Sequence, residues 1–453
     1  MTTEIRSSGL ASYRMLWRWH FYAGLFAIPF VLLLSITGAV YLFKPQIEAW
    51  QERSFDHLQL TGARTQPSQQ VAAALAAVPG SVLNAYQLPA TPQSAVRVLV
   101  GQSDRLYRVY VRPDNLQVLA TVAEDSRLMR VLFHLHGELL LGDRGSMLVE
   151  LAASWTIVLL LTGLYLWWPR QRRLAGILYP RLQGGERLFW RDLHAVTGFW
   201  ISFFALFLLL SGLPWAKSWG GMLKAVRQIN LSAPLQQDWT TGRSSELAER
   251  RTANTPAMHD HGQSRPSALA DYSPLDRLAP RVAPLNLAEP VLLAPPSHRS
   301  PQWTARSDAQ NRPLRTTLQL DPANGDVLKR TDFSQRPLLD RIIGIGVAAH
   351  EGQLFGWLNQ LLGVLTAAGL VLVSVGAAVM WWRRRRPGTL GAPAATPPQL
   401  AGAMVLLIVS LGILLPLLGL SLIAMLLLER AVLRRLPAAS RFLGLASPEI
   451  GKN

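Results

Sequence analysis

Four histidines of this chain stand at corresponding positions of an internal duplication. An offset of 174 residues aligns His20 with His194, and an offset of 214 aligns His136 with His350. Imidazole is a common metal ligand, and haem iron takes two axial ligands on opposite faces. An ionisable side chain in or near a membrane span is a functional candidate by default. The spacing therefore predicts two pairs of metal or haem ligands. The plainer alternative for each is an interfacial histidine that hydrogen-bonds a headgroup or a carbonyl.

Two hydrophobic spans in each copy must position these histidines. His20 and His194 begin spans, whereas the other pair precedes the spans that return. If the repeats pack as a four-helix bundle, one pair meets at each membrane face. The first offset also aligns Gly24 with Gly198, and small residues let a flat macrocycle or a neighbouring helix come close. Helix packing alone explains such glycines equally well.

The composition indicates a membrane protein. Of 453 residues, 49% are hydrophobic, and about 20 apolar residues suffice for a helix to cross the hydrocarbon. The first run ends without a small-residue cleavage site, so we expect it to remain as a span rather than a signal peptide. Pro416 should kink the last run, which we interpret as one span. Five runs are long enough to cross: 16–43, 146–168, 193–215, 355–382 and 400–428.

The net charge of +17 is concentrated beside these runs rather than in a nucleic-acid-binding surface. Arginines precede the first span and follow the second and fourth, which by the positive-inside rule makes those ends cytoplasmic. One final span would put Arg430, Arg434 and Arg435 outside, against this trend. The absence of cysteine excludes disulfides, thiolate zinc sites and iron–sulfur clusters.

The two long outer loops carry a similar pattern of secondary structure. The first has a helix at 67–78, strands at 95–100 and 106–111, and a turn into 116–122; the second has strands at 315–320 and 326–329 around an Asp-Pro-Ala-Asn-Gly turn. Within a Pro-rich insert at 233–313 the one helix candidate is 273–281, and we expect much of the insert to be loosely ordered.

The expected fold is a mainly α-helical membrane protein. Duplicated two-span units form a four-helix bundle plus a fifth span, with two small α+β extracytoplasmic domains. The expected order is: cytoplasmic N-terminus and first span 1–44; outer domain 45–145; span 146–169; cytoplasmic loop 170–192; span 193–216; outer domain 217–352; span 353–382; cytoplasmic loop 383–399; span 400–429; C-terminal tail 430–453.

The chain resembles the PepSY-associated transmembrane family of iron-regulated inner-membrane proteins, which includes bacterial siderophore reductases. The resemblance covers most of residues 10–430. It is carried by Trp17-Arg18-Trp19-His20 with Gly24, His134-Leu135-His136-Gly137 with Leu141-Gly142, Phe189-Trp190-Arg191-Asp192-Leu193-His194, His350-Glu351-Gly352 with Leu354-Phe355-Gly356, and the hairpins at 111–119 and 320–328.

The resemblance implies an inner-membrane protein with periplasmic PepSY-like domains that binds two b-type haems and passes electrons to ferric chelates. His20 and His194 would ligate the inner haem, and His136 and His350 the outer one, with His134 as an alternate ligand or propionate partner. Arg14, Arg18, Arg187 and Arg191 are candidate propionate partners, although topology already explains them. The electron donor would be a cytoplasmic reductase or a quinol.

Other functions remain open. A haem-free anchor whose outer domains regulate an extracytoplasmic protease or another partner would not need the four histidines. A metal transporter would use them as a relay, but the spans lack the Asp and Glu that ion paths usually contain. Arginines of the second outer loop, Arg299, Arg306, Arg312, Arg315 and Arg330, could attract anionic chelates or simply form a basic surface. Membrane lipid is an expected partner, and nucleic acid is not.

Overall fold

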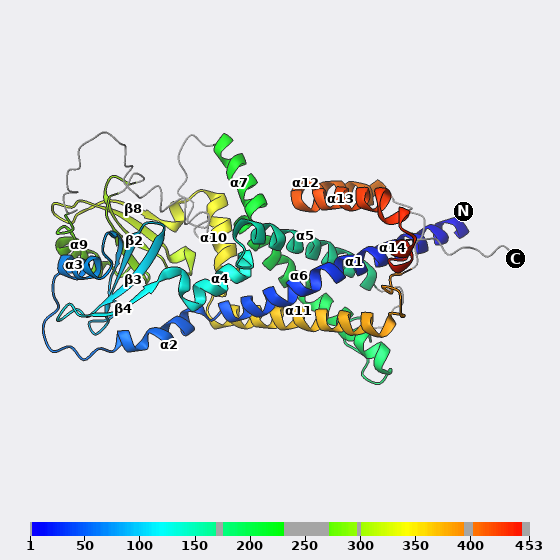
Figure 1. The fold of residues 1–453 in the computed structure, drawn as a ribbon, viewed down its shortest axis with the longest axis horizontal. Coiled ribbons are helices and arrows are strands. Elements are labelled where there is room, and N and C mark those ends of the chain that lie inside the picture. The colour runs from blue at the N-terminus through cyan, green and yellow to red at the C-terminus, as the bar shows by residue number, and fades with distance from the viewer. Residues whose placement is uncertain (1, 169–174, 231–270, 297–299, 394–401, 446–453) are drawn as a thin grey trace. The chain divides into compact units, whose positions relative to one another are not determined.

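The computed structural model describes residues 2–168, 175–230, 271–296, 300–393 and 402–445 (Figure 1). The chain divides into two compact units, each built from segments that are far apart in the sequence. We call residues 1–39, 136–234 and 361–453 the membrane unit, and residues 40–135 and 235–360 the sheet unit. Arg170, Arg172 and Arg173, on which part of the expected orientation rests, lie outside the described residues.

Five helices are long and apolar enough to cross a membrane, as expected from the sequence. The chain is therefore a multi-pass membrane protein. The first four spans belong to α1 (Thr2–Tyr41), α5 (Gly142–Trp167), α6 (Glu186–Gly212, continued by the 3-10 helix η2, Leu213–Trp215) and α11 (Trp357–Arg384).

Two helix contacts in the membrane unit obey the offsets of the sequence duplication. A methyl group on Gly24 of α1 would lie 3.8 Å from Leu159 Cδ2 of α5, and one on Gly198 of α6 would lie 3.9 Å from Val373 Cγ2 of α11. Gly24 and Gly198 are 174 residues apart, and Leu159 and Val373 are 214 apart. Both are ordinary van der Waals distances, so these glycines serve helix packing.

The last hydrophobic run is not one kinked span. It forms α12 (Gly402–Leu414), which is too short to cross alone, and α13 (Pro416–Ala431), which belongs to the fifth candidate span Pro416–Arg435. The two helices lie side by side as a hairpin (Figure 1), with Gly412 packed on Gly419. Pro416 fits the first turn of a new helix, where no amide N–H is needed. The expected single span 400–429 is therefore wrong.

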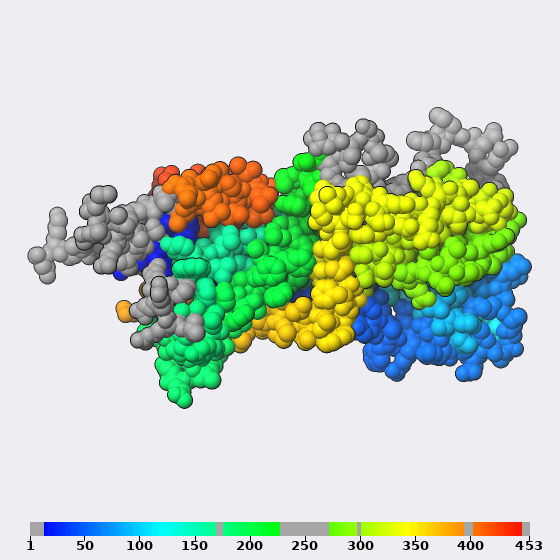
Figure 2. All heavy atoms as spheres, turned by 180° about the vertical axis from the view of Figure 1, so that it is seen from behind, coloured from blue at the N-terminus to red at the C-terminus, as the bar shows by residue number. Residues whose placement is uncertain are grey.

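The hairpin packs on the helices of the membrane unit. Leu415 and Leu418 are buried against Ile157 of α5 and Leu213 of η2, and the indole N–H of Trp155 donates to Ser421 Oγ over 3.2 Å. Figure 2 shows the hairpin in orange beside the green helices of the same unit. Its other side exposes apolar side chains, including Leu406, Ile413, Leu420 and Leu427, as expected of a surface in contact with lipid.

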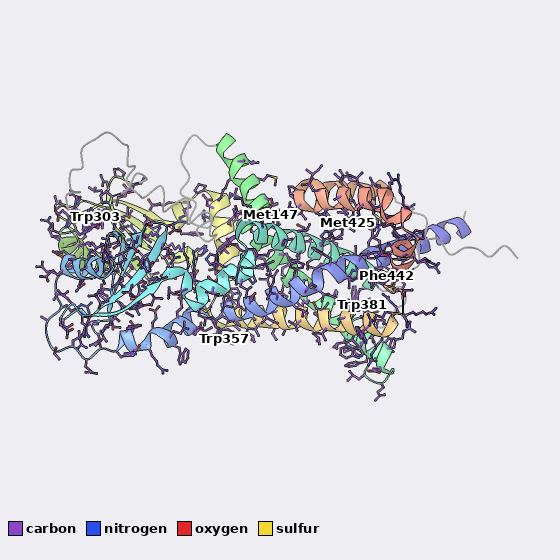
Figure 3. All side chains as sticks on the ribbon, viewed as in Figure 1. Met147, Trp303, Trp357, Trp381, Met425 and Phe442 are labelled. Atoms are coloured by element: carbon purple, nitrogen blue, oxygen red, sulfur yellow. The ribbon has the colours of Figure 1, made fainter. Side chains whose placement is uncertain are left out.

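The hairpin returns the C-terminal segment to the end of the membrane unit that carries Arg18. After η6 (Leu433–Arg435) and α14 (Pro437–Phe442), the carbonyl of Leu443 accepts hydrogen bonds from Arg18 Nη2 and from the Tyr22 hydroxyl. Trp381 and Phe442 lie at this same end (Figure 3). Arg430, Arg434 and Arg435 are thus not at the end opposite to Arg18. Their placement agrees with the charge distribution of the other loops.

The short helix α7 (Lys217–Asn230) follows η2 and is tied to α5. Its first N–H groups are capped by α5 side chains: Ser218 and Trp219 donate to the Glu150 carboxylate, at 2.9 and 3.3 Å. Glu150 is 2% exposed, so its charge is placed at the positive end of a helix dipole. Glu150 lies within the expected span 146–168, so the expectation that the spans lack Asp and Glu was wrong for this span, where the carboxylate caps a helix.

The sheet unit contains one antiparallel sheet in the order β4-β3-β2-β1-β5-β6-β7-β8. Its two halves come from the two outer loops and join through β1 and β5, where Tyr86 pairs with Leu293. The strands are β1 (Val82–Gln87), β2 (Val96–Gln102), β3 (Arg105–Val111), β4 (Val118–Ala123), β5 (Val291–Ala294), β6 (Trp303–Ser307), β7 (Thr316–Leu320) and β8 (Val327–Asp332). The two expected domains thus form a single sheet.

Helices α3 (Pro67–Ala77) and α9 (Leu275–Val282) cover one face of this sheet. The alternating Val96, Val98 and Val100 of β2 point into this core, as do Leu318 and Leu320 of β7. The sheet unit also contains α2 (Lys44–Asp56), η1 (Glu124–Ser126), α4 (Leu128–Glu138, whose end enters the membrane unit), η3 (Ala283–Leu285), η4 (Arg312–Leu314), η5 (Phe333–Gln335) and α10 (Leu338–His350).

The expected Pro-rich insert is part of the fold where the structure describes it. Residues 233–270 and 297–299 lie outside the described residues, but the remainder contains the expected helix α9 together with β5 and β6. These strands are internal members of the sheet. The expectation of loose order outside 273–281 was therefore wrong for 291–294 and 303–307, because these short strands owe their structure to pairing with distant ones.

A network of ion pairs fastens α2 to the first half of the sheet. Arg97 of β2 contacts Glu52 at 2.7 Å and Asp56 at 2.9 Å. Arg127 contacts Glu52 at 2.6 Å and Glu124 at 2.8 Å. Burial alone would raise the pKa of Glu124, but the guanidinium groups of Arg108 and Arg127 outweigh it and lower the pKa to about 2.

Candidate functional site

The structure brings two of the expected ligands together inside the membrane unit. The rings of His20 on α1 and His194 on α6 have centroids 6.3 Å apart, with an angle of 87° between their planes. With metal–nitrogen bonds of about 2 Å and ring centres roughly 1 Å behind the nitrogens, two imidazoles that share one metal have centroids about 6 Å apart. The separation thus suits two axial ligands of one iron.

The hydrogen bond of His20 fixes which ring nitrogen carries its lone pair. Nδ1 of His20 lies 2.9 Å from Oγ1 of Thr162 on α5. The Thr162 hydroxyl donates its proton to the carbonyl of Val158 over 2.7 Å, so its oxygen accepts from Nδ1–H. The lone pair of His20 is then on Nε2, the nitrogen able to ligate a metal.

His194 has the same tautomer as His20, but a different group accepts the hydrogen bond from its Nδ1–H. Its Nδ1 lies 2.9 Å from the carbonyl oxygen of Val373 on α11. A carbonyl only accepts, so Nδ1 carries the proton and Nε2 carries the lone pair. A histidine that ligates a metal typically donates its other N–H to a carbonyl, carboxylate or similar acceptor, which orients the ring. Both members of the inner pair meet this requirement.

His136, the expected outer ligand, repeats the arrangement of His20. Nδ1 of His136 lies 3.0 Å from Oγ1 of Thr37 on α1, and this hydroxyl donates to the carbonyl of Leu33 over 2.8 Å. His136 therefore also holds its lone pair on Nε2. His20 and Thr37 are 17 residues apart on α1, which corresponds to about 26 Å along a helix axis.

A glycine makes room for each of these two rings. A methyl group on Gly163 would lie 3.2 Å from Cε1 of His20, and one on Gly38 would lie 3.0 Å from Cε1 of His136. Both distances are shorter than normal for such a contact. Because the glycines directly follow Thr162 and Thr37, each Thr-Gly pair supplies both the acceptor and the space for one histidine.

The donor set fits haem better than an ion held by protein alone. Two neutral imidazoles leave a zinc ion short of the three or four protein ligands it needs, whereas haem iron needs only its axial positions filled. Within the described residues, no group of three or more His, Cys, Asp or Glu side chains is placed to hold a metal ion. The chemistry and spacing of His20 and His194 therefore fit an iron macrocycle.

The remaining candidates belong to the sheet unit. His350 is the last residue of α10; the turn that follows it is held by Asn359, which donates to the Ala349 carbonyl over 2.8 Å and accepts from the Leu354 N–H over 3.1 Å. His134 is buried on α4, edge-on to Phe133. The pairing of His350 with His136 and the role of His134 stay predictions.

The arginines near the inner pair have structural partners in two of four cases. Arg18 donates to the carbonyls of Pro393 and Leu443, and Arg191 contacts the fully buried carboxylate of Asp192, which also binds Arg181 at 2.7 Å. These contacts fix the chain around His20 and His194, so they support the topological interpretation over propionate binding. Arg14 and Arg187 are exposed.

The arginines expected to attract a chelate are partly used within the sheet unit. Arg312 is buried and lies 3.5 Å from Glu351, Arg315 donates to the Ala309 carbonyl, and Arg330 pairs with Asp332 at 3.1 Å. Arg299 lies outside the described residues. These three arginines therefore serve the fold.

Sequence reasoning found the histidines but not the groups that orient them. Thr37, Thr162 and the Val373 carbonyl were missed as histidine acceptors. A signal was present, since the same Thr-Gly dipeptide occurs in the first and second spans. Thr197-Gly198 shows that the dipeptide alone is insufficient, because Gly198 packs on Val373 instead.

A protein-family model matches most of the chain. The model described as "PepSY-associated TM region" matches residues 17–384. This range includes His20, His136, His194 and His350. Comparison with curated proteins found no match to the chain.

Proposed function

The chain belongs to the PepSY-associated TM family, and on that premise we propose that it is a dihaem transmembrane electron-transfer protein that reduces periplasmic ferric siderophores. The observation that supports this most directly is the inner pair: His20 and His194 lie 6.3 Å apart between ring centroids, and both Nδ1 atoms are hydrogen-bonded. In this proposal the protein lies in the bacterial inner membrane with the sheet unit in the periplasm.

Haem b bound at the two histidine pairs would supply one-electron chemistry that no side chain of this cysteine-free chain provides. The protein contributes ligand orientation, since Thr162 and the Val373 carbonyl hold the inner rings. We take His136 rather than His134 as the outer ligand, because Thr37 orients His136 as Thr162 orients His20. His350 is its proposed partner.

The substrate proposal rests on coordination chemistry. Siderophores bind Fe(III) through hard anionic oxygens, and adding one electron gives Fe(II), which such ligands hold less tightly. Each iron released therefore requires one electron carried across the membrane, without an acid or base from the protein. The donor would be a cytoplasmic reductase or a quinol.

A spectrum of the detergent-purified protein tests the proposal. A reduced-minus-oxidised visible spectrum with a pyridine haemochrome count should give about two b-type haems per chain. His20→Ala and the double variant His20→Ala/His194→Ala should each lose one haem, because both residues serve the same iron. His20→Ala/His136→Ala should lose both. Ferric chelate should then reoxidise the reduced wild-type protein.

His57→Ala is the matched control, because His57 ends α2 outside the spans and should leave the count unchanged. Size-exclusion profiles distinguish loss of haem from loss of fold. A colourless, well-folded protein from haem-replete cells would exclude the electron-transfer proposal. The working alternative would then be a haem-free anchor whose sheet unit regulates an extracytoplasmic protease or another partner.

A further inference from the structure

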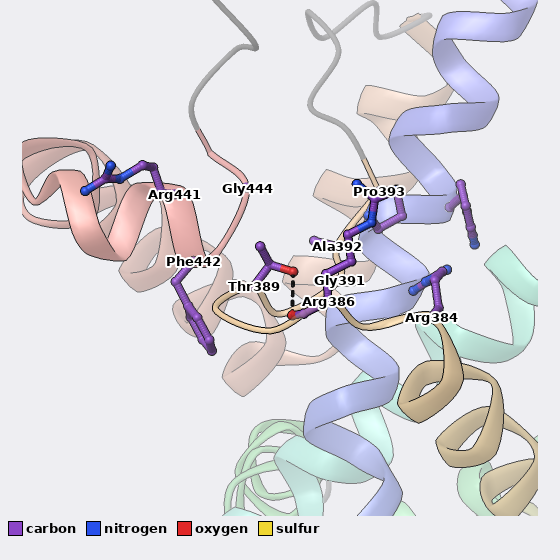
Figure 4. A pocket seen from close by; sticks show the side chains of 10 residues that line it. Arg384, Arg386, Thr389, Gly391, Ala392, Pro393, Arg441, Phe442 and Gly444 are labelled. Carbon is purple, nitrogen blue, oxygen red and sulfur yellow. Dashed lines mark hydrogen bonds between the residues drawn. The ribbon is translucent and has the colours of Figure 1, made fainter.

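An open pocket of about 380 Å³ lies at the arginine-rich end of the membrane unit (Figure 4). It is formed by α1 at Trp17, by the end of α11 with the segment that follows it, and by the end of α14, so three distant parts of the chain build it. Its lining residues are Trp17, Arg384, Arg386, Thr389, Gly391, Ala392, Pro393, Arg441, Phe442 and Gly444.

The pocket is strongly cationic. Arg384, Arg386 and Arg441 contribute to its lining, and Arg18 lies beside it, donating to the Pro393 carbonyl over 2.6 Å. Among the described residues, no carboxylate forms an ion pair with the three lining arginines. Like charges gathered in this way repel one another unless an anion joins them.

Aromatic rings fix part of this charge in place. The guanidinium of Arg384 lies 5.2 Å from the ring centroid of Trp17 and 5.1 Å from that of Phe21, within the range of cation–π attraction. Figure 4 shows Arg441 extending away from Arg384. We therefore assign ligand binding to Arg384 and Arg386, which both line the pocket.

The surroundings indicate the depth of the pocket in a membrane. Arg384 ends the apolar span of α11, next to Trp381, whose indole N–H donates to the Leu390 carbonyl over 2.9 Å. The guanidinium of Arg385 lies 3.7 Å from the ring centroid of Trp382. Tryptophans beside arginines at a span end are typical of the headgroup level. An anion at this depth is more readily supplied by lipid than by solution.

We propose that this pocket binds the phosphate group of an anionic phospholipid. Basic pockets between transmembrane helices are known to accept such headgroups. The guanidinium groups of Arg384 and Arg386 would bind the phosphate oxygens, since arginine pairs well with phosphate. The acyl chains would leave the open side toward the apolar surface of the spans. The bound lipid would offset the repulsion among the arginines and hold the C-terminal segment on α1.

Lipid retention by the full-length protein tests this assignment. Native mass spectrometry of protein purified in mild detergent should show wild type retaining added diphosphatidylglycerol in preference to phosphatidylcholine. Arg384→Gln/Arg386→Gln should weaken this retention about tenfold or more. The thermal unfolding midpoint of this double variant should no longer rise when diphosphatidylglycerol is added. Arg386→Gln alone should lose part of the lipid retention. Because it leaves the contact of Arg384 with Trp17 in place, it separates loss of lipid binding from a folding defect.

The matched control is Arg430→Gln/Arg435→Gln, which removes the same charge from exposed positions of the same unit. It should retain the lipid as wild type does. Equal weakening by the control would show general surface attraction and overturn the site. Equal stabilisation by inorganic pyrophosphate, without retained lipid, would overturn the lipid assignment in favour of a soluble phosphate compound. Lipid retention that is unchanged in both Arg384→Gln/Arg386→Gln and Arg386→Gln would overturn the pocket altogether.

Discussion

The side-chain oxygen of Thr162 accepts a hydrogen bond from Nδ1 of His20 over 2.9 Å, because its own proton is donated to Val158. A side chain of α5 thus orients a candidate ligand on α1. The same relationship joins Thr37 to His136 near the other end of α1. Helix packing and ligand orientation are therefore coupled at both positions.

Replacing Thr162 by Val should impair the inner haem site without removing a ligand. Val has the same shape but cannot accept from Nδ1–H, so the His20 ring loses its orientation. Loss of such an outer partner typically weakens metal binding by 10- to 100-fold. Haem titration into apoprotein measures the effect. Thr162→Ser keeps the acceptor and should retain affinity; equal binding by the Val and wild-type proteins would contradict the orienting role.

Gly38→Ala should disturb the outer haem site, because the new methyl group would lie 3.0 Å from Cε1 of His136. The His136 ring would have to move, and we expect about tenfold weaker haem binding at that site. Gly24→Ala is the control on the same helix, since its methyl group would meet Leu159 at an ordinary 3.8 Å. The number of haems per chain that each variant keeps after dilution of the protein measures both effects. Loss in Gly24→Ala but not in Gly38→Ala would refute the role of the space beside His136.

The sheet unit should lose stability in acid through Glu124. Its pKa of about 2 is below the ordinary value of 4.5, so the folded state binds the proton less readily than the unfolded state. The stabilisation is therefore complete above pH 4.5 and is lost as the pH falls from about 4.5 toward 2. Denaturant midpoints of wild type and Glu124→Gln, measured between pH 6 and pH 3, check this.

In that comparison the difference in stability between the two proteins should shrink as the pH falls, because below pH 4.5 the unfolded wild-type chain binds a proton at Glu124 that folding must release, whereas the glutamine of the variant binds none. Glu124→Gln leaves Arg108 and Arg127 without one carboxylate partner, and we expect a destabilisation of about 1–3 kcal/mol at pH 6. A constant difference across the whole range would contradict the linkage.

Single cysteines test the path of the C-terminal segment, since the chain has no cysteine of its own. Arg14→Cys and Ala438→Cys should react with a membrane-impermeant thiol reagent from the same side, because α12 and α13 form a hairpin. Ala323→Cys, in the turn between β7 and β8, should react from the opposite side if the sheet unit is periplasmic. Labelling of Ala438→Cys from the side of Ala323→Cys would mean that the hairpin does not form in the membrane.

The sequence predicted those elements whose signals are local. The five apolar runs and the two outer hairpins were found, because span length and the turn at Asp321-Pro322-Ala323-Asn324-Gly325 are encoded in adjacent residues. Strands β1, β5 and β6 were missed. Val82–Gln87 mixes polar and apolar residues without clear alternation, and it is ordered by pairing with β2 and β5.

The reversal at Leu415 was missed for a related reason. A proline within an apolar run is compatible with a kink or with the start of a new helix. The close contact of Gly412 with Gly419 belongs to the hairpin, and it cannot be read from Pro416 itself. The histidines of the site were found from the duplication, whereas their acceptors depend on which helix faces each ring.

The pairing of β1 with β5 has a consequence for biosynthesis. Tyr86 meets Leu293 more than 200 residues later in the chain, after two further spans have been made. Until then, the first half of the sheet presents the edge of β1, and an unpaired edge is a site for wrong association. The emerging chain must therefore keep this edge from other strands while the membrane helices between the two halves are inserted, and the sheet closes only when the second outer segment arrives.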